Sequence, residues 1–178
     1  MFLDLASKRR SIRKFQDKDV EQEKLDRILE AALRSPSSMD RKPWEFILVR
    51  NRELLAKLAE AKPHGSAFLK NAPAAVVVCA DPSRCDVWIE DASIASIYIL
   101  LAAESLGLGG CWIQIRERMH DPNTTSKAYV AELLGLPDGF EVESIVALGY
   151  PGEKKDPHPK ESLDYQKIHF EKYGSRNA

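Results

Sequence analysis

The most restrictive feature of this chain is a run without a polar side chain, Ala74–Ala80, which reads AAVVVCA. Side chains of a strand alternate between the two faces of a sheet, so a strand that is apolar on both faces has to be covered on both. The run therefore predicts a central strand. A fold that contains it needs neighbouring strands and helices that cover the sheet.

Hydrophobic spacing along the rest of the chain predicts those elements. Apolar residues recur at helical intervals in some segments and form short continuous runs in others. Asp19 is placed to cap the second helix, and Pro36 ends it. The predicted helices span residues 2–10, 19–35, 52–61, 86–106 and 126–134, and the further strands span 44–49, 111–115 and 143–148. With 178 residues, the chain fits a single domain of α+β or three-layer α/β type, with helices over a mixed sheet.

The helix predicted over residues 86–106 is apolar nearly all round, which indicates a core helix or a helix at a subunit interface. Trp88 and Tyr98 are accordingly interpreted as core or interface aromatics. Asp91 interrupts the apolar surface, and we interpret it as a cap or as the solvated edge of the helix. Gly107 is a plausible residue to follow the helix end.

The segment from residue 152 to 178 is polar and punctuated by prolines, and it cannot form a core of its own. Its aromatic residues, Tyr165, Phe170 and Tyr173, indicate a tail that lies across a surface. That surface belongs either to this subunit or to a partner.

Composition argues against several classes of protein. The apolar fraction is 44%, the charged fraction 30% and the net charge -1, which do not suit a general binder of nucleic acid or anionic membranes. No segment approaches the roughly 20 apolar residues of a membrane span, and no secretory signal is visible. The histidines are scattered and the 3 cysteines form no CxxC pair, so we expect no metal and a reducing, cytoplasmic setting.

Three motifs carry the candidate chemistry. Arg9, Arg10 and Arg13 surround the hydroxyl of Ser11, an arrangement that suits phosphate because arginine supplies forked donors. A basic helix end that complements the helix dipole is the alternative interpretation. The second motif runs from Pro36-Ser37-Ser38 to Pro43-Trp44, and its alternative is a simple helix stop and turn.

The third motif is a glycine-rich turn, with Gly107, Gly109 and Gly110, between the long helix and a strand. It lacks the GxGxxG order and follows a helix where a dinucleotide fingerprint would follow a strand, so a Rossmann site is disfavoured. A helix cap with tight packing is the alternative.

The order and spacing of these motifs resemble the FMN-dependent nitroreductase family, from Arg9 to about Gly149. The resemblance implies a three-layer α/β/α fold with a mixed, mainly antiparallel sheet. It also implies a homodimer with two FMN molecules in clefts between the subunits, and a tail, 152–178, that packs on the partner subunit. By resemblance, Arg9, Ser11 and Arg13 hold the FMN phosphate and ribityl chain, while Arg10 occupies a more variable position.

The resemblance assigns further positions to the cofactor. Arg13 would also approach the pyrimidine edge of the flavin and stabilise negative charge on the reduced ring. The loop residues would reach the flavin bound mainly by the other subunit, and the strand after the glycine turn would approach its N5 and O4 through backbone amides. These positions are Pro36, Ser37, Ser38, Met39 and Asp40 in the loop, Gly110, Trp112, Ile113 and Gln114 in the strand, and Lys160 near the phosphate.

Two positions in the loop depart from the family pattern, and one assignment in the strand has an alternative. Asp40 stands where asparagine is usual, and Lys42 stands where glutamine is usual. A carboxylate at position 40 would oppose negative charge on the flavin unless Lys42 or Arg41 pairs with it. Gln114 is equally well interpreted as a solvent-facing amide at the strand end.

The resemblance implies an oxidoreductase in which the flavin does the chemistry and no side chain acts as the catalyst. NADH or NADPH would give a hydride, and a nitroaromatic, a quinone or a similar acceptor would then receive it in a ping-pong cycle. Two alternatives keep FMN: another reaction of the same fold, such as reductive dehalogenation or enone reduction, or a flavin-binding protein with little turnover. A phosphate-binding module without flavin is the third.

Overall fold

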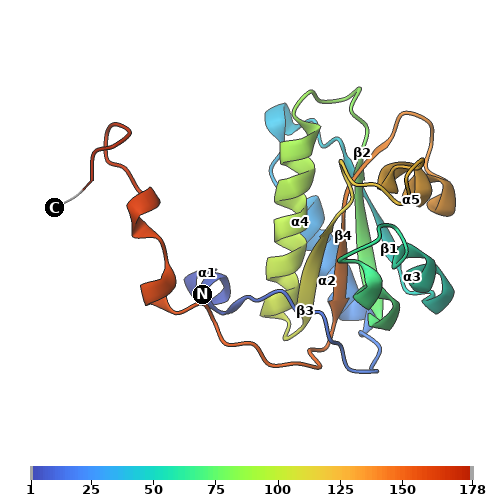
Figure 1. The fold of residues 1–178 in the computed structure, drawn as a ribbon, viewed down its shortest axis with the longest axis horizontal. Coiled ribbons are helices and arrows are strands. Elements are labelled where there is room, and N and C mark those ends of the chain that lie inside the picture. Colours follow the sequence, from blue (N-terminus) through green and yellow to red (C-terminus); the bar gives the residue numbers. More distant parts are fainter. Residues whose placement is uncertain (1, 177–178) are drawn as a thin grey trace.

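The computed structural model describes residues 2–176, and its centre is a four-stranded antiparallel sheet with the order β1-β2-β4-β3 (Figure 1). The strands are β1 (Trp44–Val49), β2 (Ala74–Ala80), β3 (Gly109–Gln114) and β4 (Glu141–Gly149). Every residue of β2 is buried, so the predicted central strand is confirmed. β1 and β3 form the two edges of the sheet.

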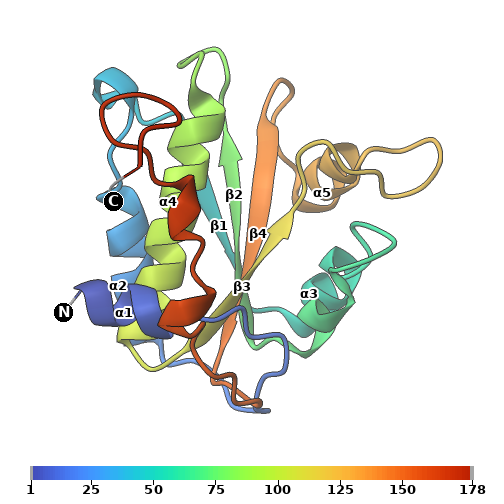
Figure 2. The same cartoon turned by 60° about the vertical axis from the view of Figure 1, so that its left-hand side comes forward.

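Helices cover both faces of this sheet and complete the three-layer α+β fold (Figure 2). One face packs against α2 (Gln22–Leu33) and α4 (Trp88–Ser105), and α1 (Phe2–Lys8) lies against α4. The other face packs against α3 (Arg52–Leu58), the 3-10 helix η2 (Ala67–Asn71) and α5 (Ser126–Leu134). Alternate side chains of β2, and those of β4 from Ile145 to Leu148, enter the two apolar clusters, which is why these stretches carry no polar side chain.

The N-terminal segment after α1 adds the one parallel pairing among the described residues. Ser11 forms a parallel bridge with Gly110 on the outer side of β3, and Phe15 forms an antiparallel bridge with Pro151. Residues 11–15 therefore run along the end of the sheet where β4 leaves it. The four named strands are all antiparallel, so the expected mixed character of the sheet is limited to this single bridge.

Two local expectations need correction. α2 begins at Gln22 after Glu21, and Asp19 instead lies 3.4 Å from Arg52, so Asp19 is not its cap. Asp91 is 3% exposed, and it is neither a cap nor a solvated edge of α4. Tyr98 is 38% exposed, which leaves the interface as the interpretation of this aromatic residue.

The C-terminal segment leaves the body of the molecule after β4 and projects away from it (Figure 1). It contains only the short 3-10 turns η3 (Lys160–Ser162) and η4 (Tyr165–Lys167). The segment is largely exposed and carries exposed apolar side chains, Leu163, Tyr165, Ile168, Phe170 and Tyr173. As the composition predicts, the tail makes no core of its own.

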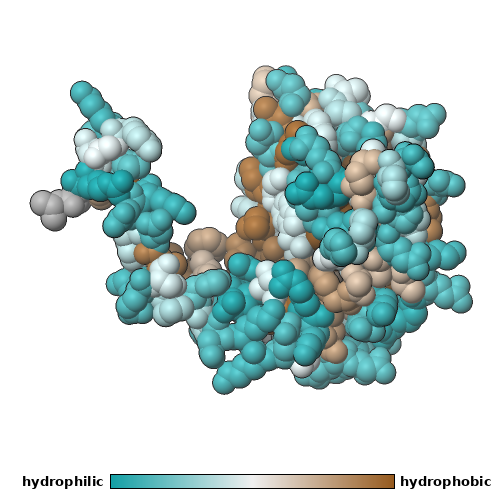
Figure 3. All heavy atoms as spheres, in the orientation of Figure 1, coloured by the Kyte–Doolittle hydropathy of each residue, from teal (hydrophilic) through white to brown (hydrophobic). Residues whose placement is uncertain are grey.

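Apolar side chains also remain exposed on α4. Ile94, Ile97 and Tyr98 are each more than a third exposed, and Figure 3 shows hydrophobic residues on the side of the body that faces the tail.

Among the described residues, no helix is both long enough and apolar enough to cross a membrane.

The core of the sheet should tolerate truncation poorly. Ile145 in β4 is fully buried, so Ile145→Ala is expected to lower the free energy of unfolding by about 2–5 kcal/mol through lost burial and an unfilled cavity. Met119→Ala, at a side chain that is 46% exposed, is the control and should change it by less than about 0.5 kcal/mol. Urea unfolding measures both, and equal losses would contradict the assigned core.

Candidate functional site

The first predicted motif lies along the backbone of the edge strand β3. The Ile12 amide donates to the Gly110 carbonyl at 3.0 Å, next to the bridge between Ser11 and Gly110. A β-carbon on Gly109 would come within 2.8 Å of the Ile12 side chain. The glycine turn therefore lets the N-terminal segment approach β3 closely, which places Arg9, Ser11 and Arg13 at its edge.

A second segment, just after β4, fixes this arrangement. Glu153 accepts from the backbone amides of Arg13 at 2.7 Å and Lys14 at 3.1 Å. Lys155 donates to the Ser11 carbonyl at 2.8 Å and lies 3.3 Å from Glu153. The hydrogen bond to the Arg13 amide is the main cause that lowers the pKa of Glu153, and Lys155 adds to that effect.

Cys111 forms the buried floor between these cations. Burial raises the pKa of its thiol, while the positive charges of Arg13, Lys155 and Arg9 and a hydrogen bond with Ser11 oppose the rise. Lys62 also interacts electrostatically with Cys111. Burial lowers the pKa of Lys62, and the charge of Arg118 lowers it further.

The cations around Cys111 outnumber the carboxylates that could neutralise them. Within residues 2–176, the side chains of Arg9, Arg13 and Lys62 form no ion pair with a carboxylate, and Glu153 alone pairs with Lys155. Unpaired cations beside a hydroxyl and a glycine backbone form a site for a phosphate or another anion. This donor set suits the phosphate end of a mononucleotide cofactor.

Two predicted cations occupy other places. Arg10 donates to the Asp156 carbonyl and so ties the tail to the segment after α1. Lys160 begins η3 in the projecting tail. It is exposed and lies away from Cys111 and the cations around Cys111. In the single chain Lys155, and not Lys160, is the C-terminal lysine at this site.

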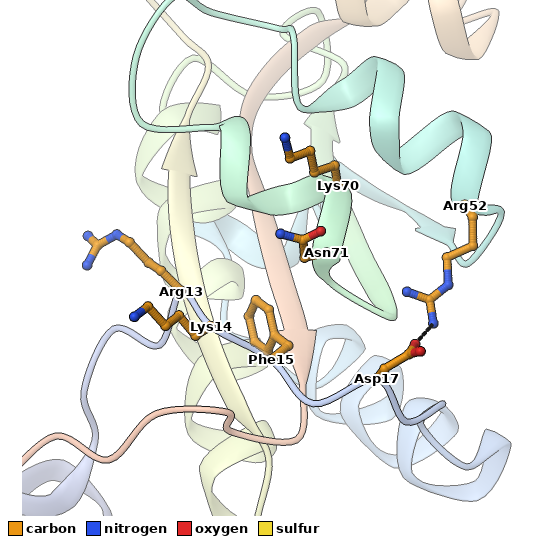
Figure 4. Close-up of a pocket in the computed structure, with 7 residues that line it drawn as sticks. All are labelled: Arg13, Lys14, Phe15, Asp17, Arg52, Lys70 and Asn71. Carbon is orange, nitrogen blue, oxygen red and sulfur yellow. Dashed lines mark hydrogen bonds and ion pairs between the residues drawn. The ribbon is translucent and has the colours of Figure 1, made fainter.

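A cavity of about 630 Å³ adjoins these residues at Arg13 (Figure 4). Arg13, Lys14 and Phe15 line one side, and Lys70 and Asn71 of η2 face them from the other. The pair formed by Arg52 and Asp17, 3.3 Å apart, lies at one end of the cavity. The guanidinium of Arg13 also lies 5.9 Å from the ring centre of Phe68.

The predicted loop 36–40 is a strained turn on the other edge of the sheet. Met39, Asp40 and Lys42 adopt φ of 50°, 56° and 48°, a left-handed conformation that side chains disfavour. Ser37 closes the turn by accepting from the Lys42 amide at 3.0 Å, and Lys42 lies 3.0 Å from the Asp40 carboxylate. The Asp40 carboxylate, which departs from the family pattern, thus pairs with Lys42, one of the two cations that could neutralise it.

The loop and the cationic edge lie far apart in one chain. Trp44, just after the loop, pairs with Ala80, whereas Gly110 pairs with Leu148, which pairs with Ala74 at the opposite end of β2. Three strand spacings and six residues separate them, which is about 14 Å across and about 20 Å along the sheet. One chain cannot bring both motifs to the same small ligand.

The end of β3 carries a buried polar network. The Trp112 indole donates to Gln114 at 2.9 Å, and the Gln114 amide donates to Glu143 at 3.4 Å. Ser93 of α4 also donates to Glu143, and Arg116 lies 3.4 Å from it. Burial raises the pKa of Glu143. Gln114 is therefore a half-buried network member, which overturns the alternative of a solvent-facing amide.

The side chain of Ile113 is 1% exposed and belongs to the core. Any contact of this position with a ligand would have to use its backbone. The predicted strand residues thus lie in β3, the edge strand that Ser11 contacts. Trp112 and Gln114 lie on one face of the sheet, and Cys111 and Ile113 lie on the other.

Sequence reasoning missed several residues of this region: Lys62, Glu143, Glu153 and Lys155. Lys155 and Glu153 stand in a polar segment where nothing local separates them from other charged residues. Glu143 did carry a signal, because it directly precedes the nearly apolar strand run 144–149, and a buried charge needs partners.

The structure shows an α+β domain with cationic side chains along an edge strand, and comparison with known proteins gives its family. The model of the nitroreductase family matches residues 6–65 and 60–150. A protein of Methanothermobacter thermautotrophicus, provisionally named NADH dehydrogenase/NAD(P)H nitroreductase, is 42% identical over 174 residues, covering 96% of this chain and 87% of the relative. The chain belongs to the nitroreductase family.

Two further relatives support this assignment. The solved structure of an FMN-dependent nitroreductase from Clostridium difficile R20291 has 49% sequence identity and a TM-score of 0.95, covering 96% of this chain and 99% of the other. An FMN reductase (NAD(P)H) of Bacillus subtilis is 30% identical and covers 90% of this chain and 71% of the relative.

The stabilisation that Glu153 provides by accepting from the amides of Arg13 and Lys14 should depend on pH. Because folding lowers its pKa from 4.5, its stabilisation is fully present above that value and is lost as the pH falls through the lower folded pKa. Glu153→Gln should therefore lower the melting temperature at pH 7, and its difference from the native chain should shrink toward pH 3. Glu161→Gln, in the exposed tail, is the matched control. A difference that is independent of pH would contradict this role.

Proposed function

We propose that this chain is an FMN-dependent oxidoreductase that takes a hydride from NADH or NADPH and passes it to a nitroaromatic, a quinone or a similar acceptor. The observation that carries the proposal is the set of unpaired cations around Ser11 and Cys111 on a glycine-lined edge strand, in a chain of the nitroreductase family. The names of its relatives, an FMN-dependent nitroreductase and an FMN reductase among them, support the same chemistry.

The cofactor phosphate is assigned to Arg9, Ser11 and Arg13, with Lys155 added from the segment after β4. Arg10 holds the tail in place and so acts on this site indirectly. Bound FMN supplies the redox chemistry, because its ring can take up a hydride from one substrate and give it to another. The chain binds and orients the cofactor and sets the charge around it.

Arg13 is placed for a second task. It lies between the cation-lined floor and the cavity that Lys70 and Asn71 also line, so one guanidinium faces both. A fixed positive charge beside the pyrimidine edge favours the reduced, negatively charged ring and raises its reduction potential. The backbone of β3 from Gly110 to Gln114 offers the strand-edge amides for the ring itself.

The complete site requires a homodimer. The loop 36–42 and the cationic edge cannot meet within one chain, so the loop of one subunit serves the cofactor held by the other. Ile94, Ile97 and Tyr98 of α4 supply an apolar surface for the partner. The projecting tail, residues 152–176, packs its apolar side chains on the partner subunit, since its own chain leaves them exposed.

The unpaired thiols of Cys79, Cys85 and Cys111 support a reducing, cytoplasmic location.

The first test is the visible spectrum of the purified protein. It should show bound FMN, bleach under anaerobic NADH or NADPH, and regain colour when a nitroaromatic or a quinone is added. Arg13→Ala should weaken FMN binding by about tenfold or more and lower its reduction potential, because a charge-assisted contact is lost.

Arg34→Ala is the matched control, because Arg34 is exposed and pairs only with Glu30 on the same helix. It should leave both quantities unchanged. A native protein that stays colourless after incubation with FMN would refute the proposal, and unchanged affinity and potential in Arg13→Ala would refute the role of Arg13.

The shared site predicts complementation between two defective variants. A variant that lacks the cations (Arg9→Ala with Arg13→Ala) and a variant with the loop 37–41 replaced by glycines should each be nearly inactive. Refolded together, they form mixed dimers in which one site takes both intact motifs, so about a quarter of the native activity should return. Each variant refolded alone is the control, and a mixture without recovery would place the whole site in one chain.

A further inference from the structure

The carboxyl group of Asp91 is buried between α4 and the strained loop, and no part of the proposed chemistry uses it. Asp91 lies in the first turn of α4 and is 3% exposed. One oxygen accepts from the Ser38 amide at 2.9 Å, and the other accepts from the Cys85 thiol at 3.3 Å. Both ends of the carboxyl group are therefore fixed by donors from outside the helix.

The contacts inside the loop do not hold it to the body of the protein. Ser37 accepts from the Lys42 and Asp40 amides, and Ser38 accepts from the Arg41 amide. These bonds close the turn on itself. They leave its orientation relative to α4 undetermined.

In the described part of the chain, two side chains of α4 and the segment before it form a hydrogen bond or an ion pair with the loop. The pair formed by Arg41 and Asp86 spans 3.3 Å, but the Asp86 side chain is 85% exposed, and an exposed pair of this kind contributes little. The bond from the Ser38 amide to Asp91 is partly buried and involves a carboxyl acceptor that is 3% exposed, which makes it the stronger of the two. Asp91 is thus the main tether of the loop.

The backbone of the loop needs such a tether. Met39, Asp40 and Lys42 hold left-handed conformations that cost free energy and persist only where surrounding contacts enforce them. Ser38 immediately precedes the first of them. A turn released from Asp91 would relax toward ordinary backbone conformations and move Met39 and Asp40.

The geometry points to Asp91 as a positioning residue that, locked by Cys85, sets the loop of one subunit in the orientation in which it meets the partner's cofactor and acceptor. This inference rests on the proposed function, because it concerns the substrate side of that site. Asp91 touches neither cofactor nor substrate. It acts through the Ser38 amide.

The test uses Asp91→Ala, which removes both acceptor oxygens, whereas asparagine would keep one that can still accept from the Ser38 amide. With the FMN-loaded dimer, kcat/KM for a nitroaromatic acceptor should fall about tenfold, mainly through a higher KM. Trypsin should cleave after Arg41 about tenfold faster, because the released loop fits a protease. The bond after Lys42 is protected by Pro43.

Asp86→Asn is the matched control: it removes a carboxylate that touches the same loop from an exposed position. Both measurements should stay at the native values. Equal losses in Asp86→Asn and Asp91→Ala, or native values in a folded Asp91→Ala, would overturn the inference.

Two variants of Cys85 keep the inference testable if Asp91→Ala does not fold. Cys85→Ala removes one donor to Asp91 and should shift both measurements about threefold in the same direction, while Cys85→Ser retains a donor and should behave as the native chain. Native values in Cys85→Ala would then overturn the role of the lock. Trypsin cleavage needs no flavin, so a failure of the proposed function, seen as no turnover in the native protein, is distinguished from a failure of the tether.

Discussion

The site depends on how closely the backbone after α1 approaches the edge of β3. Gly109 has no side chain, and that absence allows Ile12 to lie against the strand, where Ser11 and Ile12 pair with Gly110. The approach brings Arg9 and Arg13 over Cys111 and gives Glu153 and Lys155 a backbone to bind. A β-carbon at position 109 would push Ile12 and its neighbours away from β3. Arg9 and Arg13 would then no longer lie together near Cys111.

α4 has a second organising role, because polar side chains along it fix the two halves of the site. Asp91 binds the loop before β1, and two residues further on Ser93 reaches Glu143, which holds Gln114 at the end of β3. Each contact is at least partly shielded from water, so each is worth more than a fully exposed pair. The same helix exposes Ile94 and Ile97 to solvent in the single chain. One helix thus joins loop, strand and the apolar surface offered to a partner.

Sequence patterns predicted the layers well because hydrophobic period and burial are directly linked. The AAVVVCA run became the central strand, and the nearly all-apolar segment became α4. Charged residues were harder to place. Asp19 is a good capping residue in a suitable position, yet α2 begins later and Asp19 pairs with Arg52. Asp91 was interpreted as a cap or a solvated edge, because a buried acid and an exposed acid look alike in a helix until its neighbours are known.

The separation of the two motifs on opposite edges of the sheet has a consequence for how such a protein works in solution. In a dimer of the proposed kind, a lone subunit carries two half-sites and no whole one. Specific activity then depends on protein concentration, and dilution below the dissociation constant of the dimer abolishes turnover without unfolding either chain. The abundance of the chain in its cell would set the amount of catalyst and also the fraction of it that is assembled.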